Sequence, residues 1–432
     1  MQITLDNVMV MDIPEGTILA KSGSGSGAYM DSFGFVTGAG GANVFLDALR
    51  AFGQDRRSFV TKVKDVEFVA VPECNETMLR IICADELEKF EENAVSLLDG
   101  CDYVKDNFFS IEAAIDSMRN GTPVMVRVFD TSTDRVVLYP LRDTAIATIL
   151  ARLDISGSAL GTLPRNILAD HLNAYAKFCK RDARVIINNG KLECMLGPNY
   201  PLVPAEDVMA ATIAHFEGKA TFDGGSFTHT RADSVWNAGN VELKLPTSEG
   251  LVTRTFSQSV RVFTSDSGRA AMTIMPTLRE EGERHGLSFC LPLQVEHKGK
   301  GATIEKFREQ LTLIEKRFSD SWEKIVELSD LELQYPANVL LALLKWLRIP
   351  AKYGVEVYER RKAMWGDSER SAYEVYGCLS DVLSGVYAEE QKMTRLAEYQ
   401  EICARGYYFD FGRYDLPGEY SYTDRLIGSK GA

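Results

Sequence analysis

Apolar side chains in the C-terminal part of the chain recur every three or four residues, which is the spacing of one helical face. The first set is Ile304, Phe307, Leu311, Ile314, Phe318, Trp322 and Ile325. The second set is Ala372, Val375, Tyr376, Leu379, Val382, Leu383 and Val386. The first set predicts an amphipathic helix on the order of 40 Å long. We expect a helical region over residues 301–405 that covers a sheet or forms a subunit interface.

Residues 220–296 show the alternation of apolar and polar side chains that is typical of strands. The expected strands lie near residues 219–223, 226–236, 240–245, 251–265, 269–276 and 286–296. Within them, SVRVFTSDSGRAAMTI (259–274) predicts a hairpin that buries one face. Its strand residues alternate as Val260, Arg261, Val262 and Phe263, and its turn is Ser265, Asp266, Ser267 and Gly268. Asp and Ser bond locally in turns, and Gly accepts a positive φ.

Helices and strands are mixed between residues 124 and 216. Strands are expected at 124–129, 135–139, 184–188 and 191–196, and helices at 144–153, from Pro164 onward and at 205–216. Pro164 suits a first helical turn. The helix that follows it carries an apolar stripe of Ile167, Leu168, His171, Leu172, Tyr175 and Phe178. We expect this stripe to be buried, with His171 as a hydrogen-bonded core residue.

The first 120 residues combine a glycine-rich beginning with an acidic stretch. The expected elements are strands at 33–37, 67–71 and 78–83 and helices at 43–52, 86–98 and 111–118. A strand followed by glycines and a helix is typical of phosphate cradles. However, Asn43 stands where a dinucleotide motif needs glycine, and the Gly-Lys-Ser/Thr of a Walker loop is absent. We therefore interpret the 37–43 glycine turn as a tight turn without a ligand.

These elements predict an α+β fold, a largely antiparallel β meander packed against long amphipathic helices, with a separate acidic α+β N-terminal region. We divide the chain into four parts. They are the acidic N-terminal region (1–120), a β-rich core with inserted helices (121–300), a helical region (301–405) and an aromatic, glycine-rich tail (406–432). The turn signal Asn-Gly-Thr-Pro at 120–123 marks the first boundary. The tail is expected to act as a strap or to bind a partner.

The composition of the 432 residues, 45% hydrophobic and 25% charged, is typical of a folded globular protein. The start lacks the basic and apolar segments of a secretory signal, and the apolar run at 339–347 is too short to cross a bilayer. The eight cysteines include no Cys-x-x-Cys pair, and the five histidines lack zinc-binding spacing. We expect a cytoplasmic protein with reduced thiols and with neither a metal nor a cofactor.

The net charge of −13 is distributed unevenly along the chain. Residues 65–116 carry fourteen acidic side chains against Arg80, Lys89 and Lys105, a local net charge of −11. The remaining 380 residues therefore carry only −2. An acidic average alone would argue against nucleic-acid binding, which needs a basic surface. Because most of the negative charge lies in residues 65–116, the rest of the chain can still form a basic surface.

Three basic islands that also contain aromatic residues lie in this remainder, at 175–191, 297–317 and 343–362, with net charges of +4, +3 and +4. The candidate nucleic-acid-binding residues are Lys177, Lys180, Arg181, Arg184, Lys298, Lys300, Lys306, Arg308, Lys345, Arg348 and Lys352. Cations neutralise phosphates, and flat rings stack on unpaired bases at roughly 1–3 kcal/mol per base. Solvated helix faces also carry such charge runs. The hypothesis therefore depends on the islands sharing one face.

Six segments, taken in order, resemble a phage- and plasmid-associated family of uncharacterised proteins, catalogued as domain of unknown function family 932. They are VVLYPLRDTAIATILARLDI (136–155), LPRNILADHLNAYAKF (163–178), LECMLGPNYPLVPAEDVMAA (192–211), SVRVFTSDSGRAAMTI (259–274), LQVEHKGKG (293–301) and SAYEVYGCLSDVLSG (371–385). The resemblance covers about residues 124–386 and implies a setting in a bacteriophage or mobile element. It supplies no catalytic residues.

We therefore expect a non-enzymatic nucleic-acid-binding protein of a phage or mobile element, a homo-oligomer that binds or anneals single strands during replication or recombination in a bacterial cell. The alternative is a structural, assembly or host-interaction protein that uses the acidic 65–116 segment as a decoy or partner site. A metal-dependent enzyme is a third hypothesis. Its candidate residues are Asp223, His229, Asp233, His285 and His297, which come from the β region.

Overall fold

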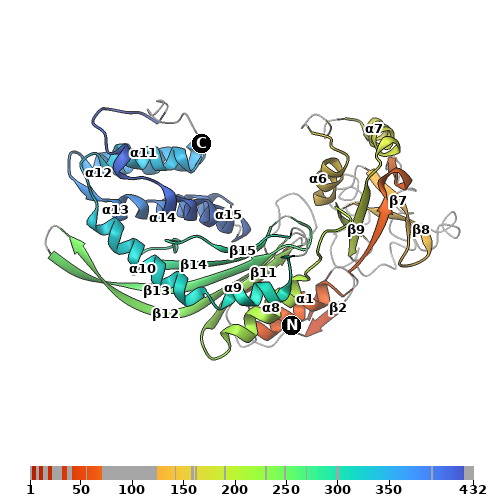
Figure 1. Ribbon diagram of the computed structural model, residues 1–432, viewed down its shortest axis with the longest axis horizontal. Coiled ribbons are helices and arrows are strands. Elements are labelled where there is room, and N and C mark those ends of the chain that lie inside the picture. The colour runs from red at the N-terminus through yellow and green to blue at the C-terminus, as the bar shows by residue number, and fades with distance from the viewer. Residues whose placement is uncertain are drawn as a thin grey trace.

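The computed structural model describes residues 2–5, 9–12, 18–21, 32–36, 41–54, 56–70, 124–141, 143–156, 160, 163–188, 191–228, 231–247, 250–268, 270–297, 301–390 and 393–422. These residues form two lobes, each around its own hydrophobic core (Figure 1). The larger core draws on residues 41–52 and 203–411, and the smaller core on residues 59–68 and 126–195. Helices and antiparallel sheets occur in both, which confirms the expected α+β class.

The larger lobe is built on an antiparallel sheet with the strand order β15-β14-β13-β12-β11-β4-β3. Its strands are β3 (Ile18–Lys21), β4 (Ser32–Val36), β11 (Thr221–Thr228), β12 (Ala232–Thr247), β13 (Gly250–Thr264), β14 (Met272–Glu280) and β15 (Leu293–Val295). The expected strands 226–236 and 240–245 have the wrong bounds. The first range joins the end of β11 to the start of β12. β12 then continues through the second range, because the chain forms a bulge between Asn237 and Gly239 instead of a turn.

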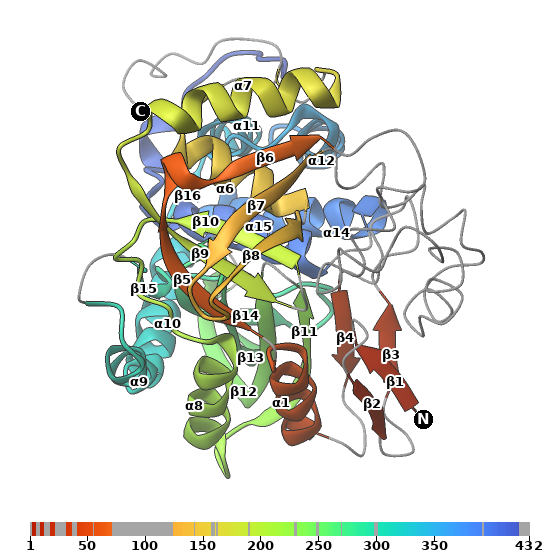
Figure 2. The ribbon, with the colours of Figure 1, turned by 90° about the vertical axis from the view of Figure 1, so that its right-hand side faces the viewer.

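Helices cover both faces of this sheet. The helices are α1 (Gly41–Phe52), α8 (Ala205–Phe216), α9 (Ile304–Leu311), α10 (Ile314–Asp330), α11 (Pro336–Trp346), α12 (Ala351–Trp365), α13 (Ala372–Gly377), α14 (Leu379–Glu390) and α15 (Met393–Ala404). In Figure 1, α11–α15 form a layer on one side of the sheet. Figure 2 shows α1 and α8 together at the other side. The helical layer therefore covers the sheet, one of the two roles expected for it.

The long helix expected over 304–325 is two helices, α9 and α10. The apolar face is as predicted, since Phe307, Leu311 and Ile325 are buried. The break comes at Thr312 and Leu313, whose N–H groups donate to carbonyls three residues back, and the Thr312 hydroxyl also donates to the Glu309 carbonyl. These local bonds tighten the last turn and end α9.

The smaller lobe contains two three-stranded antiparallel sheets, ordered β10-β9-β5 and β6-β7-β8. Its elements are β5 (Arg57–Lys62), a 3-10 turn (Val63–Asp65), β6 (Glu67–Ala70), β7 (Val124–Asp130), β8 (Arg135–Pro140), α6 (Asp143–Arg152), α7 (Arg165–Phe178), β9 (Asp182–Asn188) and β10 (Lys191–Leu196). Leu168 and Leu172 of α7 and Ile149 of α6 pack into its core.

The N-terminal residues are not a separate region in the described part of the chain. β3 and β4 extend the large sheet, β5 pairs with β9 and β6 pairs with β7. The two cores thus do not follow the expected boundary after residue 120. β1 (Gln2–Leu5) pairs only with β2 (Met9–Asp12) among described strands. Residues 71–123, which hold most of the acidic segment with its expected helices and one expected strand, lie outside the described residues.

The tail crosses the helical layer up to Tyr422. Asp415 accepts hydrogen bonds from the backbone N–H groups of Gln334 and Tyr335, just before α11. The Tyr358 hydroxyl donates to the Tyr420 carbonyl. The chain therefore runs over α11 and α12 as a strap. A short pair of strands, β16 (Glu332–Leu333) and β17 (Arg370–Ser371), joins the end of α10 to the start of α13.

Among the described cysteines, Cys194, Cys290, Cys378 and Cys403 are buried and Cys179 is half-buried, all as free thiols. Cys74, Cys83 and Cys101 lie outside the described residues. No helix in the described ranges is both long and apolar enough to span a membrane.

Gly225 lies where α1 rests on β11. An added Cβ there would lie 2.8 Å from Phe45 Cε2 and 3.0 Å from the Asp233 carbonyl oxygen. We expect Gly225→Ala to lower the free energy of unfolding in urea by about 1–3 kcal/mol, because the core is overpacked. Gly377→Ala is the matched control, since a Cβ there meets no atom within 4 Å. Equal stability of the two variants would contradict this packing of α1 on the sheet.

Candidate nucleic-acid interface

The turn between β13 and β14 is buried at the junction of the two lobes. Ser265, Asp266 and Ser267 are all buried, and the Ser265 and Ser267 hydroxyls lie 3.1 Å apart. Gly268 closes the turn with φ +73°. The hairpin was expected to bury one face, but both faces are buried. Val262 faces the side covered by α8, whereas Arg261 reaches Gln400 of α15 on the opposite side.

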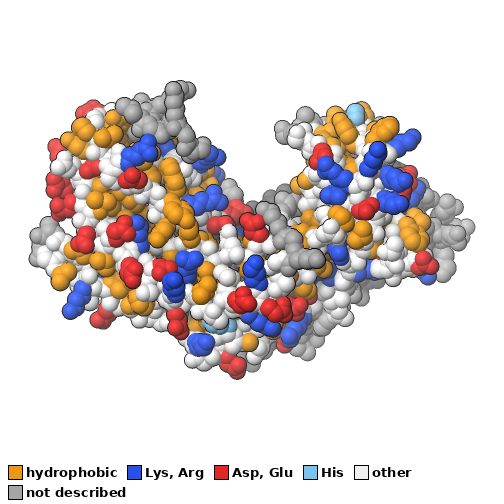
Figure 3. Space-filling view, viewed as in Figure 1, with side chains coloured by type: hydrophobic (Ala, Val, Ile, Leu, Met, Phe, Trp, Pro, Cys, Tyr) orange, Lys and Arg blue, Asp and Glu red, His pale blue; other side chains and the backbone are white. Residues whose placement is uncertain are grey.

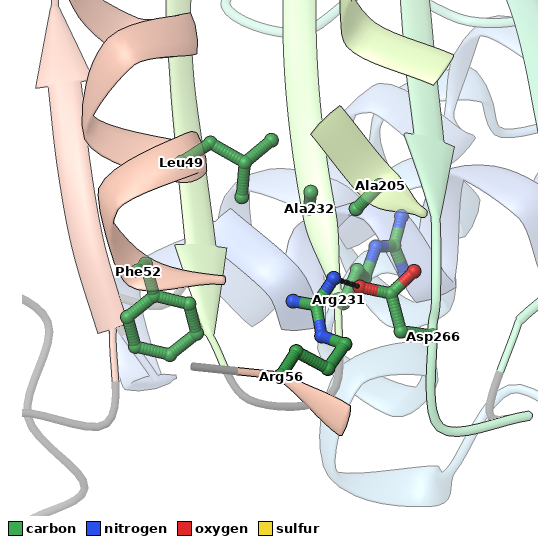
Figure 4. Close-up of a pocket in the computed structure, with 7 residues that line it drawn as sticks. All are labelled: Leu49, Phe52, Arg56, Ala205, Arg231, Ala232 and Asp266. Carbon is green, nitrogen blue, oxygen red and sulfur yellow. Dashed lines mark ion pairs between the residues drawn. The ribbon is translucent and has the colours of Figure 1, made fainter. Parts of the chain in front are cut away.

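Arg56 joins the smaller lobe to this turn. Its Nη1 lies 2.8 Å from Asp266 Oδ2 and 3.0 Å from Glu206 Oε2 at the start of α8, and its side chain is only 8% exposed. Arg56, Asp266 and Arg231 line a cavity of about 10 Å³, enough for about one water molecule (Figure 4). Leu49 and Phe52 of α1 close it on one side.

A second ion pair group lies next to the first. Asp233 accepts hydrogen bonds from Arg261 Nε at 2.9 Å and from Arg231 Nη2 at 3.2 Å. Arg261 also donates to Gln400 at 2.8 Å. Asp233 and Arg261 are diagonal neighbours on one face of the β12–β13 pair, because Asp233 pairs with Phe263 and Val235 pairs with Arg261. Buried charges of this kind are stable only when they are paired and hydrogen-bonded.

Asp266 has the unusual electrostatics in this cluster. Burial raises the pKa of Asp266 to about 7. The positive charge of Arg56 lowers this pKa, but the negative charges of Glu206 and Glu193 raise it and offset part of that effect. Burial also opposes the charge on Arg56, but Asp266, Glu206 and Glu193 together outweigh it and hold the pKa of Arg56 above its ordinary value. Arg56 therefore remains a cation while Asp266 is poised to titrate near neutral pH.

The first basic island lies at the end of α7. Lys177, Lys180 and Arg181 are exposed, and Arg181 pairs with Asp154. Arg184 differs from them, since it is half-buried in β9 and donates to the Ser58 hydroxyl and the Pro198 carbonyl at 3.2 Å each. Arg184 therefore has a structural role.

The other two islands lie on different parts of the molecule. Lys306 and Arg308 are exposed on α9, which lies low in both views, whereas α7 and α12 lie in the upper part (Figures 1 and 2). Lys298 and Lys300 lie outside the described residues. In the third island, the Lys345 ammonium lies 5.7 Å from the Tyr422 ring and the Lys352 ammonium 4.5 Å from the Tyr353 ring, while Arg348 is exposed after α11. The three islands do not share one face, so the basic surface expected from all three together does not form, and any binding surface must rest on one island alone.

α7 exposes a row of side chains that the sequence pattern predicted to be buried. Leu168, Leu172 and Ala176 point into the smaller core. The neighbouring row, Ile167, His171, Tyr175 and Phe178, is exposed, so His171 is not a core residue. Phe178 is 81% exposed and Tyr175 is 53% exposed. The apolar face of α7 is wider than the sheet edge it covers. Figure 3 shows hydrophobic side chains together with Lys and Arg over this end of the smaller lobe.

A groove lies between α6 and the buried turn, with a volume of about 340 Å³. Its described lining residues are Ala147, Thr148, Ala151, Arg152, Met195, Leu196, Gly197, Ser267 and Gly268. Arg152 Nη2 donates to the Asp182 carbonyl, immediately after Arg181. The groove therefore lies next to the basic end of α7.

The residues of the enzyme hypothesis do not meet. Asp233 is neutralised by two arginines, His297 stacks on Tyr200 and His285 packs against Tyr387. His229 lies outside the described residues, and Asp223 is exposed on β11. Within the described ranges, no group of three His, Cys, Asp or Glu side chains could hold a metal ion.

Some of these residues had a signal in the sequence and others had none. Arg261 in SVRVF lies between two valines of a strand, and Asp233 in ADSVW lies in a segment that is otherwise small or apolar; charged side chains in such strands indicate buried ion pairs. Arg152 has no such signal, because its partner carbonyl is thirty residues away in the chain. Arg56 likewise meets its partners only in the folded protein.

Asp266 makes the stability of the protein depend on pH. In the unfolded chain the pKa of an aspartate is about 3.9. Because folding raises it to about 7, the folded state holds more protons between these values. The extra proton on Asp266 therefore stabilises the folded state. Its contribution to the free energy of unfolding has its full value below about pH 4 and is lost as the pH rises through about 7. We expect a loss of about 2–3 kcal/mol between pH 5 and pH 8.

Urea unfolding of the wild type, Asp266→Asn and the exposed control Asp47→Asn over this pH range measures the effect. The wild type and Asp47→Asn should share the slope, and Asp266→Asn should lack it. An identical pH dependence in all three proteins would refute the assignment.

No protein-family model, curated protein or solved structure matches this chain.

Proposed function

We propose that this protein binds single-stranded nucleic acid at the C-terminal end of α7. The observation that carries the proposal is the exposure of two aromatic rings, Tyr175 and Phe178, beside three exposed cations, Lys177, Lys180 and Arg181. Isolated exposed apolar residues are common on protein surfaces. Here the rings continue a row of exposed side chains along the helix and adjoin the cations of the same segment.

The rings favour a single strand over a duplex. A base in a duplex is stacked on both sides, so its face is not available to a protein ring, whereas an unpaired base can stack on Tyr or Phe. Residues three apart on a helix lie close together on its surface. Tyr175 and Phe178 can therefore receive neighbouring bases of one strand.

The cations supply the contacts to phosphates. Lys177 and Lys180 are exposed, and Arg181 keeps part of its guanidinium exposed beside Asp154. Among the described residues of the three islands, this island alone combines exposed cations with strongly exposed rings on one element. We therefore assign the interface to Lys177, Lys180 and Arg181, and we leave the α9 and α12 islands outside it.

On the family resemblance, such binding would serve replication or recombination of a phage or mobile element, in the host cell. The alternative, an assembly or interaction protein, draws on the tip of the β12–β13 hairpin, where Leu251 is 72% exposed and Val252 is also exposed. Strand edges with exposed apolar residues tend to pair with other chains. Light scattering separates the two, since large assemblies without nucleic acid favour the alternative.

The cation pair Lys177→Ala/Lys180→Ala tests the phosphate contacts, with Lys306→Ala/Arg308→Ala on α9 as a control of equal charge change. Fluorescence anisotropy with a labelled oligothymidylate at about 50 mM to about 200 mM salt gives the affinity and its salt slope. Each lost contact lowers the slope by about 0.7, so the α7 variant should lose about 1.4. An equal effect of the α9 variant, or no binding by the wild type at low salt, would refute the interface.

The ring pair Tyr175→Ala/Phe178→Ala tests the stacking. We expect the affinity for the same oligonucleotide to fall about tenfold or more with an unchanged salt slope, because stacking releases no counterions. A duplex of the same length should bind equally weakly to the variant and the wild type. Wild-type affinity in the ring variant would show that the exposed row on α7 serves another purpose.

A further inference from the structure

We infer that the groove between α6 and the β13–β14 turn is a second part of the binding site, one that holds a nucleotide of the same strand with its phosphate on Arg152. This inference rests on the function proposed for α7. The groove volume of about 340 Å³ is within the range of small-ligand sites, about 300–1,000 Å³. It can hold one nucleotide, and it is too small for a folded partner.

The charge of the groove selects an anion. Arg152 is the one charged side chain among the nine described residues that line it. Among the described residues no carboxylate pairs with Arg152, since its contact is the Asp182 carbonyl. That contact fixes Nη2, while Nη1 lies on the side of Gly197, 4.0 Å from the position of an added Cβ. Arginine presents donors in a planar fork that matches phosphate.

The walls of the groove let a ligand approach the backbone closely. Ala147, Ala151, Gly197 and Gly268 are small, and they come from three separate segments. Met195 and Leu196 supply an apolar surface for a sugar or base. The Thr148 hydroxyl already makes two hydrogen bonds within the protein: it donates to the Ala145 carbonyl and accepts from the Met195 N–H. The site is therefore rigid on the α6 side.

The groove continues the surface at the end of α7. Arg152 donates to the carbonyl of Asp182, and Arg181 pairs with Asp154, so residues 152–154 and 180–182 are held together. A strand stacked on Phe178 passes Lys180 and Arg181 before it reaches Arg152. Figure 3 shows Lys and Arg side chains over α6 and α7, on the wall beside the hollow between the lobes. A free nucleotide has the same phosphate chemistry but no link to α7.

Strand length distinguishes the groove from the α7 surface. Oligothymidylates of about six and about sixteen nucleotides are compared by anisotropy in the full chain. We expect the longer strand to bind the wild type more tightly. Gly197→Leu, which fills the groove without changing the charge, should lose this gain while still binding the short strand like the wild type. Gly197→Ala is the control, since its Cβ makes only the 4.0 Å contact with Arg152.

Arg152→Gln should weaken binding of the longer strand about tenfold and reduce its salt slope by about 0.7, and Arg152→Lys should keep the slope. Thymidine monophosphate should not compete with the short strand, and it should lower the affinity of the longer strand only to that of the short one. If the monophosphate binds the groove but the longer strand binds no more tightly than the short one, a free nucleotide is the occupant and the strand path is wrong. If Gly197→Leu and Arg152→Gln bind both lengths like the wild type, the groove is refuted while the α7 interface stands. Loss of all binding in the wild type refutes both.

Discussion

Arg56, buried between Asp266 and Glu206, makes the contacts on which the arrangement of the two lobes depends. Arg56 immediately precedes β5, the first strand of the smaller lobe, and Asp266 lies in a turn of the large sheet. Because the two side chains are only 8% and 7% exposed, water cannot replace a lost partner. Removing Arg56 would leave the carboxyl groups of Asp266 and Glu206 without their cation, which is far more costly than loss of a surface pair. Arg56 thus fixes the smaller lobe against the buried turn.

The groove and the exposed face of α7 follow from this junction. The turn that carries Asp266 also supplies Ser267 and Gly268 to the groove wall, so the same few residues hold the lobes and shape the site. The smaller lobe has two short sheets, which cover only the Leu168 row of α7. The row with Tyr175 and Phe178 is left in contact with solvent beside the cations. The small size of the core of the smaller lobe therefore explains why Tyr175 and Phe178 are exposed, and the proposed function depends on that exposure.

Local patterns in the sequence predict local structure well in this protein. The helix expected at 205–216 has those bounds in the structure, and the apolar stripes at 304–325 and 372–386 are buried. The break at Thr312 escapes the pattern because it arises from backbone bonds. The exposure of Phe178 escapes it because periodicity gives the width of an apolar face but not the width of what covers it. The pairing of β4 with β11 and the contacts of Arg56 join distant residues, which no local pattern records.

The account's central claim is that unpaired bases stack on the exposed rings of α7. Photo-crosslinking of a bromouridine-substituted single strand, followed by peptide mass spectrometry, tests it most directly. The major crosslinks should fall within residues 166–180, at Tyr175 or Phe178. Crosslinks confined to the α9 or α12 segments, with none in α7, would contradict it.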